Sequence, residues 1–235
     1  MPTSATTERA ARARTAGRHR RRRTSTRLTA VVAVLAAAAA ALVVLGLAAR
    51  DPAGAGDVPV VRADSHHLAD GGEGAPVLVE FLDLECEACA AAHPLVHELR
   101  EEHEGRLSVV ARHFPMPGHL NAETAAVAAE AAAQQGAFAP MVDRMYETQP
   151  QWGEQQESKA ALFRGFAADL RLDLEAYDAA VADPATLARV ARDLRDGQAL
   201  GVQGTPTFFL DGEPIAPRSV AELRQLVADA VAEAP

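Results

Sequence analysis

Two cysteines three positions apart are the residues of this sequence best suited to chemistry. Cys86 and Cys89 stand in the segment Cys86-Glu87-Ala88-Cys89, and the chain contains no other cysteine. A disulfide between them would close so short a loop that it removes little entropy from the unfolded chain, which makes it a weak structural cross-link. The spacing therefore favours reversible thiol–disulfide exchange.

The order of the two thiols follows from a helix expected to begin at Cys86. A cysteine at a helix N-terminus faces unpaired backbone N–H groups and the positive end of the helix dipole, and both favour the thiolate. We therefore expect Cys86 to be the nucleophile. Cys89, one turn further along, is expected to be the buried thiol that resolves a mixed disulfide. Because the sulfur atoms carry the electrons themselves, no cofactor is expected.

The apolar pattern around the cysteines predicts an α/β fold. Short apolar runs at Val77–Leu82 and Leu107–Phe114 are typical of buried strands, and the first ends just before the cysteines. Helical periodicity follows, and then a strand at Thr207–Leu210, a short strand around Ile215 and a final helix after Ser219. The expected helices between the second and third strands cover 121–136, 138–146, 158–170 and 183–194.

Several residues are assigned to packing or to helix ends by these patterns. Asn121 is expected to cap its helix, and Ser219 and Glu222 are expected to form a capping box. Apolar spacing predicts that Leu187 lies on the buried face of its helix, and that Val220 does so in the last helix.

The strand-and-cysteine segment and a second loop together resemble the thioredoxin superfamily, and more closely its DsbA-like branch of exported proteins. The resemblance is carried by Val77–Phe81 followed by the cysteines, by Pro94, and by Gly204–Phe209. It covers about 58–232. It implies a thioredoxin-like fold with an α-helical insertion at about 120–200, and a protein-disulfide oxidoreductase activity.

The same resemblance implies roles for residues around the cysteines. Glu80, six positions before the first cysteine, is expected to lie beneath the pair and relay a proton for Cys89, with a pKa raised by burial. Pro94 matches a kink in the active-site helix. Pro206 is expected to be a cis-proline that exposes the backbone of Thr205 for pairing with a substrate strand.

The sequence departs from its relatives between and beside the cysteines. Glu87 and Ala88 stand where relatives often carry Pro, Gly, His or Tyr. The carboxylates of Glu85 and Glu87 flank Cys86 and are expected to disfavour its thiolate. We therefore predict a centre that is less oxidising than the strongest DsbA oxidants.

The first 57 residues are expected to place the domain outside the cytoplasm. Residues 1–27 form an Arg-rich tail, and 28–49 are an uncharged run long enough for a transmembrane helix that contacts the lipid bilayer. The positive charge preceding this run favours a cytoplasmic N-terminus and an extracytoplasmic domain at 58–235, joined by a linker at 50–57. The alternative is a cleaved signal peptide, whose apolar region is usually shorter.

Charge excludes one class of function for the globular part. After residue 50 the chain carries 13 Lys and Arg against 31 Asp and Glu. Nucleic-acid phosphates require a basic face, so no nucleic-acid partner is expected.

Zinc binding is an alternative use of the second cysteine. Cys89, His93 and His97 are four residues apart in turn and would share one face of a helix. The usual zinc pattern instead separates two ligand pairs by a loop, and Pro94 disturbs the helical register, so no metal is expected. Of the other histidines, His113 and His119 are expected at the surface or at a cap.

Within the thiol chemistry, the direction of electron flow stays open. An oxidase would deliver its disulfide to thiol-containing client proteins and be recycled by a membrane redox partner, and this is the first choice. An isomerase or reductase would act on disulfide-bonded clients while a membrane partner kept it reduced, and Thr205 fits both. A domain that only holds peptides is a third possibility. The clients, the recycling partner and the oligomeric state are not encoded plainly.

Overall fold

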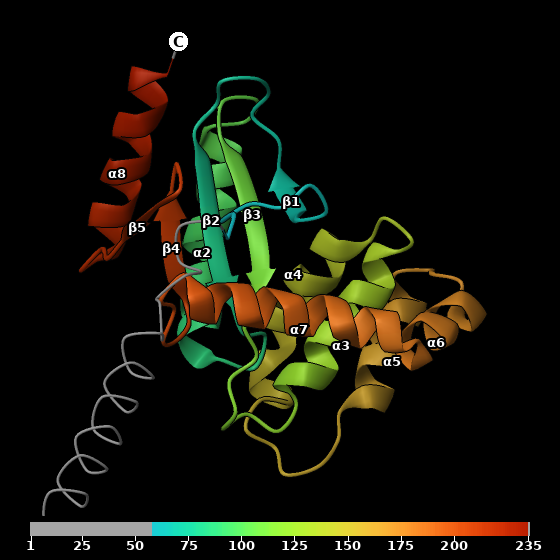
Figure 1. Ribbon diagram of the computed structural model, residues 1–235. Helices are drawn as coiled ribbons and strands as arrows, with labels where there is room; N and C mark the ends of the chain where they lie inside the picture. The colour runs from blue at the N-terminus through green and yellow to red at the C-terminus, as the bar shows by residue number, and fades with distance from the viewer. Residues whose placement is uncertain (1–57, 235) are drawn as a thin grey trace, which may run out of the picture. The chain divides into compact units, whose positions relative to one another are not determined.

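Five strands form a mixed sheet in the order β1-β3-β2-β4-β5 (Figure 1). The structure is a computed structural model, and it describes residues 58–234. Strand β2 runs parallel to β3 and antiparallel to β4, while β1 pairs antiparallel with β3. The strands span His66–Ala69 (β1), Val77–Leu82 (β2), Ser108–His113 (β3), Thr207–Leu210 (β4) and Glu213–Ile215 (β5).

The helices expected from the sequence are present in the expected order, with α6 added among them. Helix α2 (Glu87–Glu102) connects β2 to β3, and α8 (Val220–Glu233) follows β5. Five α-helices lie between β3 and β4, and in Figure 1 most of them stand to one side of the sheet while α7 runs back across it. They are α3 (Ala122–Ala133), α4 (Phe138–Thr148), α5 (Ala160–Asp169), α6 (Leu174–Ala182) and α7 (Pro184–Ala199), with a 3-10 turn η1 (Gln149–Gln151) after α4.

Alternate residues of β2 face opposite sides of the sheet. Leu78 and Leu82 pack with residues of α2 and α8 in one apolar cluster, whereas Phe81 belongs to a second cluster that contacts α7. Because side chains alternate along a strand, Glu80 shares the face of Leu78 and Leu82. The fold thus directs Glu80 toward the helix that carries Cys89.

A buried arginine joins the sheet to α7 on the opposite face. The side chain of Arg112 from β3 is fully buried, and its Nε donates to Oδ1 of Asp193 at 2.7 Å while its Nη2 donates to Oδ2 of Asp196 at 2.5 Å. Its Nη1 donates to the carbonyl of Val60 at 2.7 Å. One guanidinium therefore holds three segments that are far apart in the sequence.

Replacing Arg112 with alanine is expected to lower the free energy of unfolding by about 3–5 kcal/mol, because Asp193 would remain as a buried charge without this partner. Arg164→Ala is the matched control, since Arg164 makes a two-point ion pair with Asp178 in which both side chains are about half exposed. Chemical denaturation of the two variants measures the difference. Equal losses would show that burial does not set the strength of the Arg112 pairs.

The structure corrects several expectations about helix ends and faces. Asn121 precedes α3, but its side chain makes no cap; it instead binds the carbonyls of residues 155 and 157 and the backbone N–H of Lys159. Leu187 and Val220 are exposed rather than buried. The Ser219 hydroxyl does cap α8, whereas the Glu222 carboxylate bonds the backbone of the residue before Ser219.

Two elements were not anticipated from the sequence. Strand β1 contains two adjacent histidines and has no strongly apolar run, so its pairing with β3 gave no clear signal. Helix α6 begins at an Asp173 side chain that accepts hydrogen bonds from the N–H groups of Glu175 and Ala176. Both elements are short, and tertiary contacts rather than a long local pattern define them.

The expected N-terminal segments at 1–27, 28–49 and 50–57 lie outside the described residues. Between residues 58 and 234, the structure has no helix that combines the length and the apolar character of a membrane span.

Candidate active site

The two cysteines lie where β2 ends and α2 begins. Cys86 occupies the N-cap position of α2 and is partly exposed, whereas Cys89 lies in the first turn and is fully buried. Both are present as free thiols. A partly exposed sulfur beside a buried one is the arrangement expected of an attacking and a resolving thiol.

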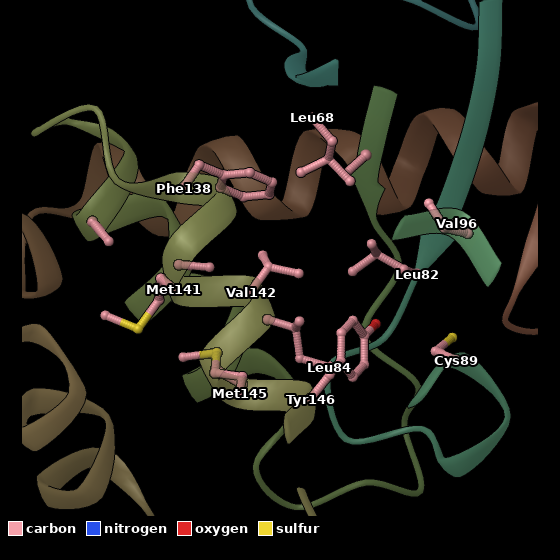
Figure 2. Packing of buried hydrophobic residues seen from close by; sticks show 14 of the residues in the cluster. Leu68, Leu82, Leu84, Cys89, Val96, Phe138, Met141, Val142, Met145 and Tyr146 are labelled. Carbon is pink, nitrogen blue, oxygen red and sulfur yellow. The ribbon is translucent and has the colours of Figure 1, made fainter. Parts of the chain in front are cut away.

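Helix α4 of the insertion covers the buried cysteine and its surroundings. Figure 2 shows Val142 and Tyr146 on the side of α4 that faces Leu82 and Cys89, with the ring of Tyr146 beside Leu84. The Tyr146 hydroxyl donates to the carbonyl of Asp83 at 3.2 Å. The insertion therefore shields Cys89 from water and fixes the chain just before Cys86.

The environment of Cys86 favours its thiolate. A hydrogen bond from the Cys89 thiol is the largest cause that lowers its pKa, to about 5, and it outweighs the effect of partial burial. A hydrogen bond with the side chain of Thr205 lowers the pKa of Cys86 further. The backbone N–H groups of Cys89 and Ala88, at the start of α2, do the same. Cys86 is therefore largely ionised at neutral pH.

Glu85 has a different role from the one expected from its place beside Cys86. The buried carboxylate of Glu85 accepts hydrogen bonds from the backbone N–H groups of Asn121 at 2.6 Å and Glu154 at 3.0 Å. It is committed to the loops of the insertion, and it is not among the largest causes that shift the pKa of Cys86. The prediction of a centre less oxidising than the strongest DsbA oxidants now rests on the pKa of Cys86. This pKa, about 5, lies above the value of roughly 3.5 typical of DsbA.

Titration of the reduced protein is expected to show a single thiolate forming with a midpoint near pH 5, followed by thiolate absorbance in the ultraviolet. Cys89→Ala should raise this midpoint, because it removes the hydrogen bond that does most to lower the pKa. A midpoint near the ordinary value of about 8.5 would contradict the geometry.

Glu80 lies beneath the buried thiol, as expected. Its side chain is only 3% exposed, and its Oε1 atom has no hydrogen-bond partner among the described residues. Burial, followed by the negative charge of Cys86, raises the pKa of Glu80 to about 8. Burial also raises the pKa of Cys89, and the hydrogen bond to Cys86 and the charge of Glu80 add to the effect. Glu80 and Cys89 are therefore both protonated in neutral solution and electrostatically coupled.

The second motif of the sequence lies against the nucleophile. The Thr205–Pro206 peptide bond is cis, as expected. The Cys86 thiol donates to the Thr205 carbonyl with 3.4 Å between Sγ and O. The loop is closed by the hydroxyl of Thr207, which donates to the carbonyl of Gly204 at 2.7 Å. Residues 119 positions apart in the chain thus meet at Cys86.

Two further side chains support the site and were missed in the sequence. Gln149 donates through Nε2 to the carbonyls of Leu84 and Cys86, each at 3.0 Å. Asp83 accepts from the backbone N–H of Met116 and lies 2.6 Å from Nδ1 of His119. Their partners are more than 30 residues away in the chain, so no local motif could have revealed them.

Histidines at this site differ from expectation. Although burial lowers the pKa of His119, the hydrogen bond and charge of Asp83 raise it above its usual value, and the side chain is partly exposed. His113 is buried rather than at the surface. The ring of His93 lies tilted against that of Tyr146 and is 3.2 Å from Asp143, while His97 is exposed beside Glu101. The partners of these two histidines thus differ from those of the alternative in which they bind zinc with Cys89.

Comparison with known proteins agrees with this geometry. The family model described as thioredoxin matches residues 64–229. The chain belongs to the thioredoxin superfamily. A thioredoxin-like oxidoreductase from Silicibacter pomeroyi shares its fold with a TM-score of 0.62 and 24% identity, over 76% of this chain and 98% of that one.

Its fold is that of the DsbA-like branch. Alpha-DsbA1 from Wolbachia pipientis superposes with a TM-score of 0.64 at 17% identity, covering 74% of this chain and 94% of that one. A match of this extent must include a large part of the helical insertion, because the remainder of the described domain is too short to supply it.

A curated relative has a quite different description. A protein named Na(+)/H(+) antiporter NhaA from Herminiimonas arsenicoxydans is 36% identical over 154 residues, which are 66% of this chain and 24% of that protein. The chain therefore spans about a quarter of that relative's length. The likeness lies in a part of the antiporter of about the size of a thioredoxin-like domain.

Proposed function

We propose that this protein is a thiol–disulfide oxidoreductase that oxidises the thiols of client proteins through a Cys86–Cys89 disulfide. The observation that carries the proposal is the pairing of a partly exposed Cys86, with a pKa of about 5, with a fully buried Cys89 above Glu80. A nucleophile that is stable as a thiolate is also a good leaving group, which favours transfer of the disulfide to a client.

The oxidation proceeds in two exchanges. A client thiolate attacks Sγ of Cys86, the Cys86–Cys89 bond breaks, and Cys89 leaves with the electron pair and takes up a proton from Glu80. A second client thiolate then attacks the client sulfur of the mixed disulfide, and Cys86 leaves as a thiolate. The client loses two electrons and the cysteine pair gains them.

The loop around Pro206 gives the client a place to bind. An extended client segment pairs with the backbone of Thr205, which already lies within hydrogen-bond distance of Cys86. Backbone pairing selects for extended or unfolded chains rather than for a particular sequence. This suits proteins that meet the enzyme before they have folded.

The sequence supports an extracytoplasmic site of action. The Arg-rich residues 1–27 followed by the uncharged run at 28–49 have the pattern of a membrane anchor with a cytoplasmic N-terminus. After each cycle the reduced pair has to pass its electrons on, and a membrane redox partner is the natural acceptor for a domain held at the bilayer. The proposal thus includes client proteins and a membrane partner, and requires no cofactor.

An oxidative folding assay tests the proposal. The oxidised full-length protein is mixed with a reduced, unfolded client that regains activity only when its disulfides form. We expect client activity to return in proportion to the oxidised enzyme added, and to become catalytic when glutathione disulfide is present as the oxidant. If the reduced enzyme instead accelerates the loss of client disulfides and the oxidised enzyme is inert, the proposed direction is wrong.

A further inference from the structure

A buried cluster of two histidines and one glutamate lies apart from the cysteines. Nε2 of His66, from β1, is 2.8 Å from Oε1 of Glu130 in α3, and Nε2 of His113, from β3, is 3.1 Å from the same oxygen. One ligand atom from each side chain lies within 4.8 Å of the other two, and this is the one such triad of metal-capable groups within residues 58–234. We propose that the cluster is a zinc site.

The chemistry of the three groups suits a divalent transition ion. Two imidazoles and a carboxylate are a common zinc donor set, with bonds of about 2.0–2.2 Å. Tetrahedral ligands around such an ion lie roughly 3.4 Å apart. The two nitrogens are 2.8 and 3.1 Å from the Glu130 oxygen, and all three atoms lie within 4.8 Å of one another, so small movements of the side chains would let all three bind one ion. Nitrogen donors also favour zinc over calcium or magnesium.

A second observation points to a ligand at this place. The side chain of His113 is 2% exposed, and its Nε2 atom is buried without a geometrically acceptable hydrogen bond among the described residues. It nevertheless points toward the oxygen that His66 already binds. Buried polar atoms without a partner are uncommon, and a bound ion is one of the ways in which they are satisfied.

The surroundings hold the two rings in place and balance the charge. The ring of His66 stacks on Phe138 with centroids 3.9 Å apart, and the ring of His113 meets Phe138 edge-on at 5.6 Å. Nε of Arg189 lies 4.0 Å from the Glu130 carboxylate. Nη1 of Arg189 is only 2.6 Å from the Asp193 carboxylate, which offsets much of the positive charge of Arg189. His66 is 18% exposed, which leaves an access route for an ion.

The three ligands come from separate parts of the fold. They belong to the edge strand β1, to β3 of the central sheet and to the first helix of the insertion. An ion bound to all three would tie the insertion to the sheet. Binding would raise the free energy of unfolding. Once the zinc concentration exceeds the dissociation constant of the site, this free energy would grow with the logarithm of the zinc concentration.

Zinc titration of the full-length protein tests this site, with Cys86 and Cys89 oxidised so that neither thiol can bind metal. We expect one equivalent of zinc, measured by competition with a chromogenic chelator, and a rise in the midpoint of thermal unfolding. His66→Gln should weaken binding at least tenfold, since even the loss of an outer-shell partner of a zinc ligand costs about 10- to 100-fold. Glutamine keeps an amide donor for Glu130, and His66 is partly exposed, so this variant is expected to fold.

His67→Gln is the matched control, because His67 is the next residue on β1 and lies outside the triad. It should bind zinc as the wild type does. The proposal is overturned if the oxidised wild type binds no zinc, if His66→Gln binds as tightly as His67→Gln, or if binding appears only when the cysteines are reduced.

Discussion

Replacing Cys86 with serine is expected to reduce client oxidation to the uncatalysed background, a loss of at least about 1000-fold. Serine occupies nearly the same volume, but it cannot form the disulfide that carries the two electrons. The oxidative folding assay measures the loss. The fold should be unaffected, because Cys86 is partly exposed and lies at the edge of the core.

Cys89→Ser provides the informative contrast. This variant keeps Cys86, whose thiolate can attack a client disulfide and displace one of its two sulfurs, but it lacks the Cys89 thiol that would resolve the resulting mixed disulfide. Mixed with disulfide-bonded clients, it should therefore accumulate covalent Cys86–client complexes that disappear on reduction. Non-reducing electrophoresis detects them. A Cys86→Ser protein that still assisted client folding at the wild-type rate would favour a domain that only holds peptides.

Glu80→Gln is expected to slow the release and re-formation of the Cys89 thiolate by about 100-fold, which is the low end of the usual contribution of general acid–base catalysis. Glutamine has nearly the shape of glutamate but cannot exchange a proton. Stopped-flow measurement of the exchange with a small disulfide gives the rate. In the wild type, attack by Cys89 should become faster as pH rises through about 8, the pKa of Glu80, and this rise should be absent in the variant.

The same substitution should change the dependence of stability on pH. Because the pKa of Glu80 is raised from 4.5 to about 8 in the folded protein, folded molecules keep a proton that unfolded molecules release between these values. This contribution is complete below pH 4.5 and is lost as pH rises through about 8. At pH 9 the free energy of unfolding of Glu80→Gln should therefore exceed that of the wild type by a few kcal/mol. At pH 4 the two free energies should be nearly equal.

Glu87→Gln is the control for both measurements. Glu87 lies beside Cys86 but is exposed at the start of α2. Its removal should leave the pH profile of Cys89 and the stability curve close to those of the wild type. If Glu80→Gln and Glu87→Gln behaved alike, the proton relay assigned to Glu80 would be wrong.

Much of the catalytic centre could be predicted because it is encoded locally. The Cys86–Cys89 pair is a local motif, whereas the place of Glu80 beneath it was expected from the family resemblance, and strand alternation agrees with the face that it occupies. The cis bond before Pro206 was expected from the family resemblance rather than from any property of the residues. The resemblance also implied the helical insertion, whose strongly periodic helices gave clear signals of their own.

The remaining parts depend on contacts between distant segments. Nothing local indicates that the Glu85 carboxylate turns to the backbone of Asn121, and its proximity to Cys86 in the sequence suggested the opposite role. Gln149 reaches the active-site loop from 63 residues away. His66 and His113 gain a common partner only when β1 joins the sheet, and that strand has too weak a pattern to be recognised.

Two exposed apolar residues show where helical periodicity fails to predict burial. Leu187 and Val220 continue the apolar spacing of their helices, but both lie at helix starts, where the covering elements end. Helical periodicity identifies a face of the helix, whereas burial depends on how far the neighbouring element extends along it.

The reduction potential of the Cys86–Cys89 pair tests the central claim most directly. The full-length protein is equilibrated with glutathione redox buffers, and the fraction of disulfide is measured by alkylation and mass spectrometry. The account predicts one two-electron transition between roughly −180 and −120 mV, as expected of a disulfide donor with a stabilised thiolate. A potential near −270 mV, about that of thioredoxin, would contradict it and would indicate a protein that must receive electrons rather than remove them.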